Sequence, residues 1–337
     1  MTVRAAFEAQ GPICASLGSP FMGRLMPLIG NRLQPGSAVA DRILAWPGDT
    51  TAAGDSVPLR LAGALHALKL DGLALGDVYP PHNVDDDQLW HAVEQALLDH
   101  NARVQFWLNS PPQTNEVRRA AVILPALARV AALFDQPVEL LELGASAGLN
   151  LRCDQFWLDL PGGGIGAPGS AVHIAPEWTG PVPTGPLPRI VRRAGVDLNP
   201  LSPDSPEDRL RLLAYTWPDQ DDRIARITAA FDIAGRVPAT VDAGDAADWL
   251  EQTLAAAAPD RVRVVFHTVA WQYFPEATKA RALAAFEGSA SSVVRIAMEA
   301  DGGHGAAVTM TVWPGGKTTV LGRASFHGIW VNWQDEA

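Results

Sequence analysis

The chain has 337 residues, of which 47% are hydrophobic and 19% are charged, and it contains two cysteines. This composition is typical of a globular protein of one or two domains, and two cysteines far apart in the sequence exclude a disulfide scaffold. The net charge of -11 argues against a protein that mainly binds nucleic acid or an anionic membrane surface.

The first residues are not expected to form a signal peptide, because Arg4 and Glu8 interrupt the apolar run. The most apolar long segment, residues 120–134, contains Pro125 and Arg129 and is shorter than the ~20 residues of a membrane span. Arginine far outnumbers lysine and alanine is abundant, which indicates a GC-rich bacterial genome. We therefore predict a cytoplasmic bacterial protein without a membrane anchor.

Residues 1–136 are predicted to form a helical region that caps the fold or selects the substrate. Apolar residues recur at helical spacing in 59–70, 88–100 and 116–134. Three aspartates at 85–87 precede the second helix, where negative charge complements the helix dipole. The histidines here lack metal-ligand spacing, so no metal site is predicted.

Residues 137–337 are predicted to form an α/β domain with a Rossmann-like, mostly parallel sheet, since strands alternate with helices. A final antiparallel hairpin, 307–312 with 318–322, is expected around a Pro-Gly-Gly turn. Strands are expected at 138–143, 189–196, 239–243, 262–266 and 292–298, with helices at 206–215, 221–233, 246–257 and 276–286.

A segment rich in glycine and proline, residues 160–188, interrupts this alternation. We predict a surface loop there, because long loops are functional only in some proteins. The alternative is a short edge strand or a flap over a pocket, formed by residues 172–174 and 177–178.

The turn after the first strand, ELGASAGLN at residues 142–150, has the form of a ligand-binding corner. An acidic strand end, Glu142, precedes Gly144 and Gly148, which allow a tight turn and close approach of a ligand. Ser146 and Asn150 complete the segment. It resembles the first motif of class I S-adenosylmethionine-dependent methyltransferases, which implies that Glu142 handles the cationic amino-acid end of the cofactor.

Three later segments resemble further parts of that family in the same order. GVDLNP, residues 195–200, implies that Asp197 contacts the ribose hydroxyls, although it lies 49 positions after Gly148. GDA implies that Asp245 and Ala246 lie against the adenine, while Asp245 could also cap the next helix. The stretch from His267 to Tyr273 corresponds to the side that faces cofactor and substrate, and we predict His267 as a base and Tyr273 as a second catalytic residue.

The chain also resembles a bacterial family known as domain of unknown function 2332. The resemblance rests on QTNEVRR (113–119), residues 140–157, GVDLNP, WPDQ (217–220), GDAADWL (244–250) and VVFHTVAWQYFP (264–275). Within the first of these segments, Asn115 is a predicted helix N-cap. Arg119 is a candidate partner for the cofactor carboxylate, against the alternative of a solvated arginine face.

These features predict a methyltransferase that uses S-adenosylmethionine and acts on a small molecule, with Asn115, Arg119 and the 142–150 turn among its cofactor contacts. One alternative is a noncatalytic module that binds the cofactor or a protein. The other is a serine hydrolase, because GASAG is also a G-x-S-x-G elbow with Ser146 as nucleophile. The acid and base of that hydrolase are then to be found among Asp242, Asp245, His267, His304 and His327.

Overall fold

The computed structural model describes residues 1–335 and divides the chain into two compact units. The first unit consists of Met1–Thr114 and Pro206–Ala225, and the second of Asn115–Ser205 and Arg226–Ala337. This division differs from the predicted boundary at 136/137. A segment from the middle of the chain belongs to the first unit, and the helix before the first strand belongs to the second.

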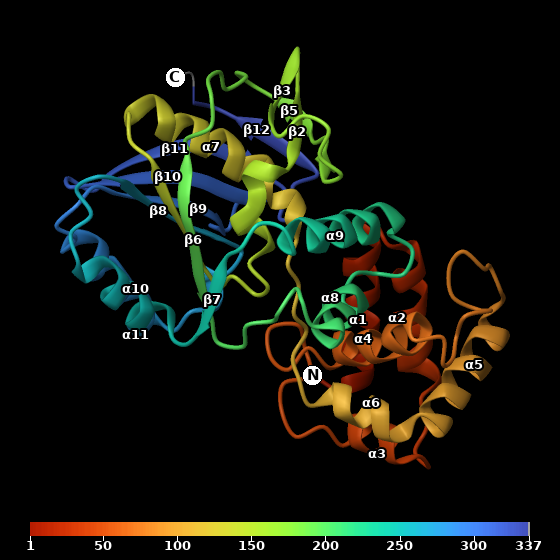
Figure 1. The fold of residues 1–337 in the computed structure, drawn as a ribbon. Coiled ribbons are helices and arrows are strands. Elements are labelled where there is room, and N and C mark those ends of the chain that lie inside the picture. Colours follow the sequence, from red (N-terminus) through yellow and green to blue (C-terminus); the bar gives the residue numbers. More distant parts are fainter. Residues whose placement is uncertain (336–337) are drawn as a thin grey trace. The chain divides into compact units, whose positions relative to one another are not determined.

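The first unit is helical (Figure 1). Its core is a cluster of aliphatic, methionine and aromatic side chains contributed by most of its helices. The aspartates at 85–87 act as predicted, since Asp85 caps α5 and Asp86 and Asp87 lie in its first turn. The helices are α1 (Val3–Ser16), α2 (Pro20–Arg32), α3 (Ala38–Leu44), α4 (Val57–Leu70), α5 (Asp86–Asp99), α6 (Asn101–Leu108) and α8 (Pro206–Ala214), together with the start of α9 (Asp221–Ala234).

The second unit contains a nine-stranded, mixed sheet, which confirms a mixed α/β protein with a large, mostly parallel sheet. Its order is β5-β12-β11-β10-β9-β8-β1-β6-β7. Strands β7, β6, β1, β8 and β9 are mutually parallel, and β10 to β12 follow as an antiparallel meander. The strands are β1 (Val138–Leu143), β5 (Glu177–Thr179), β6 (Ile190–Asp197), β7 (Thr240–Ala243), β8 (Val262–Thr268), β9 (Val293–Ala300), β10 (Ala306–Trp313), β11 (Lys317–Ala324) and β12 (Trp330–Trp333).

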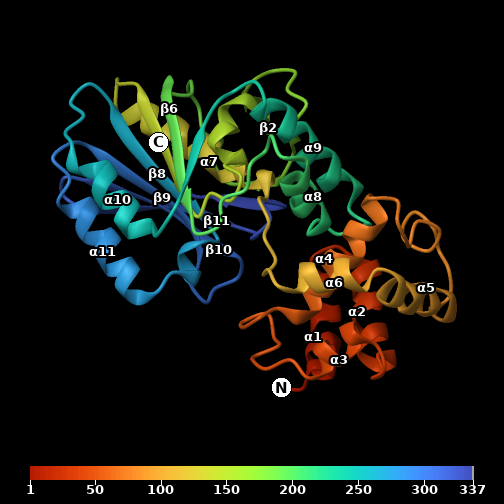
Figure 2. The same ribbon diagram turned by 60° about the horizontal axis from the view of Figure 1, so that its bottom comes forward.

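Helices cover both faces of this sheet. Figures 1 and 2 show α10 (Ala246–Ala255) and α11 (Glu276–Glu287) on one face and α7 (Ala120–Leu133) on the other. On the first face, Leu141 and Leu143 of β1 share a core with Leu250 and Phe286. Every residue of β1 is buried, which explains why its sequence shows a continuous apolar run instead of alternation.

The predicted loop at 160–188 is wrong, because this segment contains strands. A small sheet of order β3-β2-β4 combines β2 (Trp157–Leu160), β3 (Gly163–Gly166) and β4 (His173–Ile174), and β5 pairs with β12 of the large sheet. The alternative of a short edge strand is therefore the one found. The glycines that suggested a loop instead permit a tight β2–β3 hairpin, where Gly162 has a φ of 84°.

Candidate functional site

The turn at 144–150 lies where the strand order of the sheet reverses. β6 pairs with one side of β1 and β8 with the other. The chain builds β6 and β7 outward on the first side before it returns to β8 and β9 on the second. Open α/β sheets bind ligands beyond the carboxyl ends of the strands at such a reversal. The predicted cofactor turn therefore occupies the place in the sheet at which a ligand is expected.

Two glycines of the turn are required by its conformation and packing. Gly144 and Gly148 have φ angles of 72° and 63°, in the left-handed region. A Cβ atom at 144 would lie 2.7 Å from the Ala270 Cβ, and one at 148 would lie 2.8 Å from the Val241 Cγ2. The turn thus packs closely against β7 on one side and the loop after β8 on the other.

Most backbone N–H groups of the turn donate within the protein. Gly144 and Ala145 both donate to the carbonyl of Val196, over 2.9 and 3.0 Å, and Gly148 donates to the Ala145 carbonyl. Ser146 donates its N–H to the Asp197 carboxylate over 2.8 Å. These amides are therefore already used within the protein, and a ligand here would meet side chains.

Three buried oxygen atoms in the turn segment have no hydrogen-bond partner within residues 1–335. They are Glu142 Oε2, Ser146 Oγ and Asn150 Oδ1, on residues only 2%, 3% and 1% exposed. Buried polar atoms in native proteins are nearly always paired, so an unpaired one calls for an explanation. Three of them within nine residues mark this turn as a place where a polar ligand would complete the hydrogen bonding.

Burial raises the pKa of Glu142 well above its usual range, and the neighbouring Asp197 carboxylate raises it further. The positive charges of Arg119 and Arg152 act in the opposite direction. Glu142 therefore keeps its proton to higher pH than an exposed glutamate does. A cation placed against it would favour the charged form.

Asp197 ends β6 beside the turn, as predicted. Its Oδ2 accepts from Ser146 N–H over 2.8 Å, and its Oδ1 accepts from Asn199 N–H over 2.9 Å. Each carboxylate oxygen has a second lone pair, so hydrogen bonds to ligand hydroxyls remain open to it. The 49 positions from Gly148 to Asp197 contain η2 (Leu149–Gln155), a 3₁₀ helix, then the strands of the small sheet, β5 and β6.

Asp245 caps α10, which confirms the capping alternative. Its Oδ1 accepts from the N–H groups of Ala247 and Asp248, and its Oδ2 accepts from the Thr278 hydroxyl of α11 over 3.0 Å. Ala246 is the first residue of α10 and is buried. The adenine contact expected of Asp245 and Ala246 stays a prediction. The Asp245 carboxylate already accepts hydrogen bonds from α10 and from Thr278.

Asn115 and Arg119 both form hydrogen bonds to the loops of the site. The N-cap predicted at Asn115 is wrong: Glu116 caps η1 (Val117–Arg119), and Asn115 Oδ1 instead accepts from Leu149 N–H over 2.9 Å. Arg119 donates to the carbonyls of Thr268 and Phe326. These bonds link the chain before α7 to the glycine turn and to the loop after β8.

His267 lies at the end of β8 and is completely buried. Its Nδ1 lies 2.7 Å from Glu299 Oε1, and its Nε2 accepts from Arg295 Nε over 2.9 Å, so both ring nitrogens are used. Burial lowers the pKa of His267, although the Glu299 hydrogen bond acts against this. Its predicted role as a base therefore lacks a free nitrogen in this arrangement.

Glu299 holds the loop after β8 in position. This role was not predicted from the sequence. Besides His267, its Oε1 accepts from the N–H groups of Ala270 and Trp271 over 3.0 and 3.1 Å. The Trp271 ring stacks on His267, with Arg295 4.2 Å from its centroid. In the sequence, this role is indicated only by the two charged residues Arg295 and Glu299 within the otherwise apolar pattern of β9.

Tyr273, the second predicted catalytic residue, is 72% exposed and ends η3 (Trp271–Tyr273). The structure places it on the same loop that Glu299 holds in position. Its catalytic role stays a prediction.

The serine hydrolase alternative lacks its catalytic contacts. Ser146 has a left-handed φ of 53°, as a strained nucleophile could have, but its Oγ has no hydrogen-bond partner within residues 1–335. His267 is engaged elsewhere. The turn leads into a 3₁₀ helix, whereas a nucleophile elbow leads from its strand into an α-helix.

Among residues 1–335, no three histidine, cysteine, aspartate or glutamate side chains come together as a metal site. In the same part of the chain, no helix has the length and apolar character needed to cross a bilayer.

Comparison with known proteins identifies a family and no curated relative. Residues 4–333 match a family described as uncharacterized proteins conserved in bacteria, DUF2332. The match spans nearly the whole chain, so the protein belongs to this family. No curated protein is significantly similar to the chain.

Proposed function

We propose that this DUF2332 protein binds S-adenosylmethionine at the turn after β1 and transfers its methyl group to a small-molecule acceptor. The observation that carries the proposal is the group of three unpaired, buried oxygens on Glu142, Ser146 and Asn150 at the point of strand-order reversal. In sequence, the same turn resembles the first motif of class I methyltransferases.

The chemistry of these residues suits the cofactor. Glu142 provides an acidic group for the cationic amino-acid end, and Asp197 provides carboxylate oxygens for ribose hydroxyls. Ser146 and Asn150 add buried oxygens that lack partners within residues 1–335. The left-handed glycines at 144 and 148 keep the backbone turn compact beside these groups.

Bound S-adenosylmethionine supplies an electrophilic methyl group. The contribution of the protein is then to align the acceptor and to exclude water, which supplies much of the rate in such a transfer. Glu299 holds the loop 269–271 through two backbone N–H groups, so this side of the site is rigid. Tyr273, at the end of η3 directly after this loop, is exposed and available to an acceptor.

Isothermal titration calorimetry of the full chain with S-adenosylmethionine tests the proposal. We expect saturable binding, weakened about fivefold by Ser146→Ala through the loss of one hydrogen bond, and about tenfold or more by Glu142→Gln. Asp197→Ala should also weaken binding. Ser16→Ala, at the exposed end of α1, and Asp260→Ala, in an exposed loop, serve as controls with unchanged affinity.

Absence of binding to a folded chain would overturn the proposal. Binding that none of the three site variants weakens would place the cofactor elsewhere and would also overturn it. Labelling of Ser146 by a fluorophosphonate probe, abolished in Ser146→Ala, would favour the hydrolase instead.

A further inference from the structure

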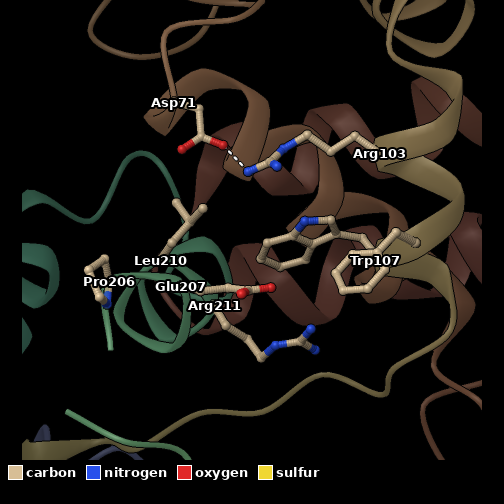
Figure 3. Close-up of a pocket in the computed structure, with 8 residues that line it drawn as sticks. Asp71, Arg103, Trp107, Pro206, Glu207, Leu210 and Arg211 are labelled. Carbon is tan, nitrogen blue, oxygen red and sulfur yellow. Dashed lines mark hydrogen bonds and ion pairs between the residues drawn. The ribbon is translucent and has the colours of Figure 1, made fainter. Parts of the chain in front are cut away.

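A hollow of about 430 Å³ lies within the helical unit, formed by the end of α4, by α6 and by the first turns of α8 (Figure 3). This volume is typical of a small-molecule site. All the residues that line it belong to the first compact unit. None of the residues that line the hollow belongs to the glycine turn.

Aromatic and aliphatic side chains give the hollow an apolar surface. Trp107 is almost fully buried, while Phe106 beside it is 51% exposed although it is a large hydrophobic residue. Leu210 of α8 adds an aliphatic contact. An exposed phenyl ring next to a buried indole is a surface suited to a planar or branched apolar group.

Four charged side chains surround this apolar surface, and their charges sum to zero. Asp71 and Arg103 form an ion pair at the upper edge of the hollow in Figure 3. Glu207 and Arg211, one helical turn apart on α8, are drawn at its lower edge, and neither side chain has a hydrogen bond or ion pair to another residue within 1–335.

The position of Arg211 is fixed by an aromatic ring. Its guanidinium carbon lies 5.2 Å from the centroid of the Trp107 ring, a cation–π distance. The Arg211 guanidinium makes no hydrogen bond or ion pair within residues 1–335, so its N–H donors are available to a ligand. Arg211 therefore presents donors suited to a carboxylate, on a side chain that is already ordered.

We propose that this hollow binds an α-amino acid in its zwitterionic form, with an apolar or aromatic side chain. Arg211 receives the carboxylate, Glu207 receives the ammonium group, and Phe106, Trp107 and Leu210 contact the side chain. A pure anion would meet the Glu207 carboxylate, and a pure cation would meet Arg211. A neutral apolar ligand would cover both charges without pairing them, at a cost in free energy.

Titration of the full chain with L-phenylalanine, phenylacetate and phenethylamine, followed by ligand-observed NMR, tests this assignment. The three probes share a phenyl ring, and the latter two each lack one of the two charges. We expect L-phenylalanine to bind with a Kd of about 1 mM or tighter, as is reasonable for a small ligand in an open site. Each of the other two should bind at least about tenfold more weakly, since each leaves one charge unpaired.

Variants connect the binding to the two residues. Arg211→Gln and Glu207→Gln should each weaken L-phenylalanine at least about tenfold, while Arg209→Gln and Asp208→Asn, neighbours on α8 that do not line the hollow, should not. Glu207 is exposed, so its variant stays informative if Arg211→Gln fails to fold. Glu142→Gln should bind L-phenylalanine like the wild type, whatever its effect on S-adenosylmethionine.

Three results would overturn the assignment. They are no L-phenylalanine binding at ~10 mM, equal binding of all three probes, and full binding by the Glu207→Gln variant.

Discussion

Gly148 shows how strongly one residue is constrained at the turn after β1. Its φ is 63°, and an added Cβ would lie 2.8 Å from Val241 Cγ2 and 3.0 Å from Leu151 Cδ1. Gly148→Ala should lower the free energy of unfolding by about 2–5 kcal/mol, from left-handed strain together with overpacking. Urea denaturation of the variant measures this loss.

Gly302→Ala is the matched control for Gly148→Ala. Gly302 also has a left-handed φ, 85°, but no atom lies within 4 Å of its virtual Cβ. The Gly302→Ala substitution should lower the free energy of unfolding only by the backbone contribution, about 1–2 kcal/mol. Equal losses at the two positions would show that packing at Gly148 contributes nothing.

Glu142 should make stability depend on pH. Its folded pKa lies above the ordinary value of 4.5, so above pH 4.5 the folded state binds more protons than the unfolded state. The free energy of unfolding contributed by this group therefore falls as pH rises from 4.5 toward the folded pKa. Glu142→Gln lacks this titration and should gain stability relative to the wild type between pH 4.5 and 8. Urea midpoints across that range test it, and a constant difference would contradict it.

His66 lies where α4 packs against α8 and should make stability depend on pH in the opposite direction. Its Nδ1 lies 3.2 Å from the Ala214 carbonyl, and burial, with a smaller contribution from Lys69, lowers its pKa from 6.5 to about 4. Between pH 6.5 and 4 the unfolded state binds more protons, so stability falls as pH falls, by roughly 3 kcal/mol in total. His66→Gln should remove this loss in urea denaturation at pH 4.5 and 7.5. The prediction is contradicted if the wild type and the variant lose the same free energy of unfolding between pH 7.5 and pH 4.5.

The loop after β8 depends on β9 through Glu299. Glu299→Ala leaves a buried histidine and the N–H groups of Ala270 and Trp271 without their acceptor, and should cost about 3–5 kcal/mol. Thermal and urea unfolding measure the cost. Glu276→Ala removes an exposed glutamate paired with Lys279 and should change stability by less than about 0.5 kcal/mol.

Elements with a clear local pattern were predictable. The apolar run 138–143 is β1 with the same bounds, and the strand predicted at 189–196 is β6 within one residue. The hairpin of β10 and β11 was also predicted, and the structure confirms it. The insertion was mispredicted because strands of two to four residues are too short to show periodicity, and because β5 pairs with β12, which is distant in sequence.

At the scale of the whole molecule, the helical unit is discontinuous in sequence. Ala214 and Tyr215 of the segment 206–225 are buried in the core of the first unit, whose other part is residues 1–114. A fragment of residues 115–337 would therefore expose them. We expect it to bind the dye ANS more strongly than the full chain does. Circular dichroism of the fragment serves as the control for folding, and equal ANS fluorescence from a folded fragment would contradict the prediction.

The sequence by itself determined the succession of strands and helices, the composition of the glycine turn and the position of Asp197 at the end of β6. These follow from short-range patterns: apolar runs, turn residues and caps. Only the tertiary structure decided what His267, Asp245 and Asn115 do, because their partners Glu299, Thr278 and Leu149 lie 32 to 34 residues away. Hydrogen bonds over such separations depend on how elements pack, and local sequence does not encode that packing in a readable pattern.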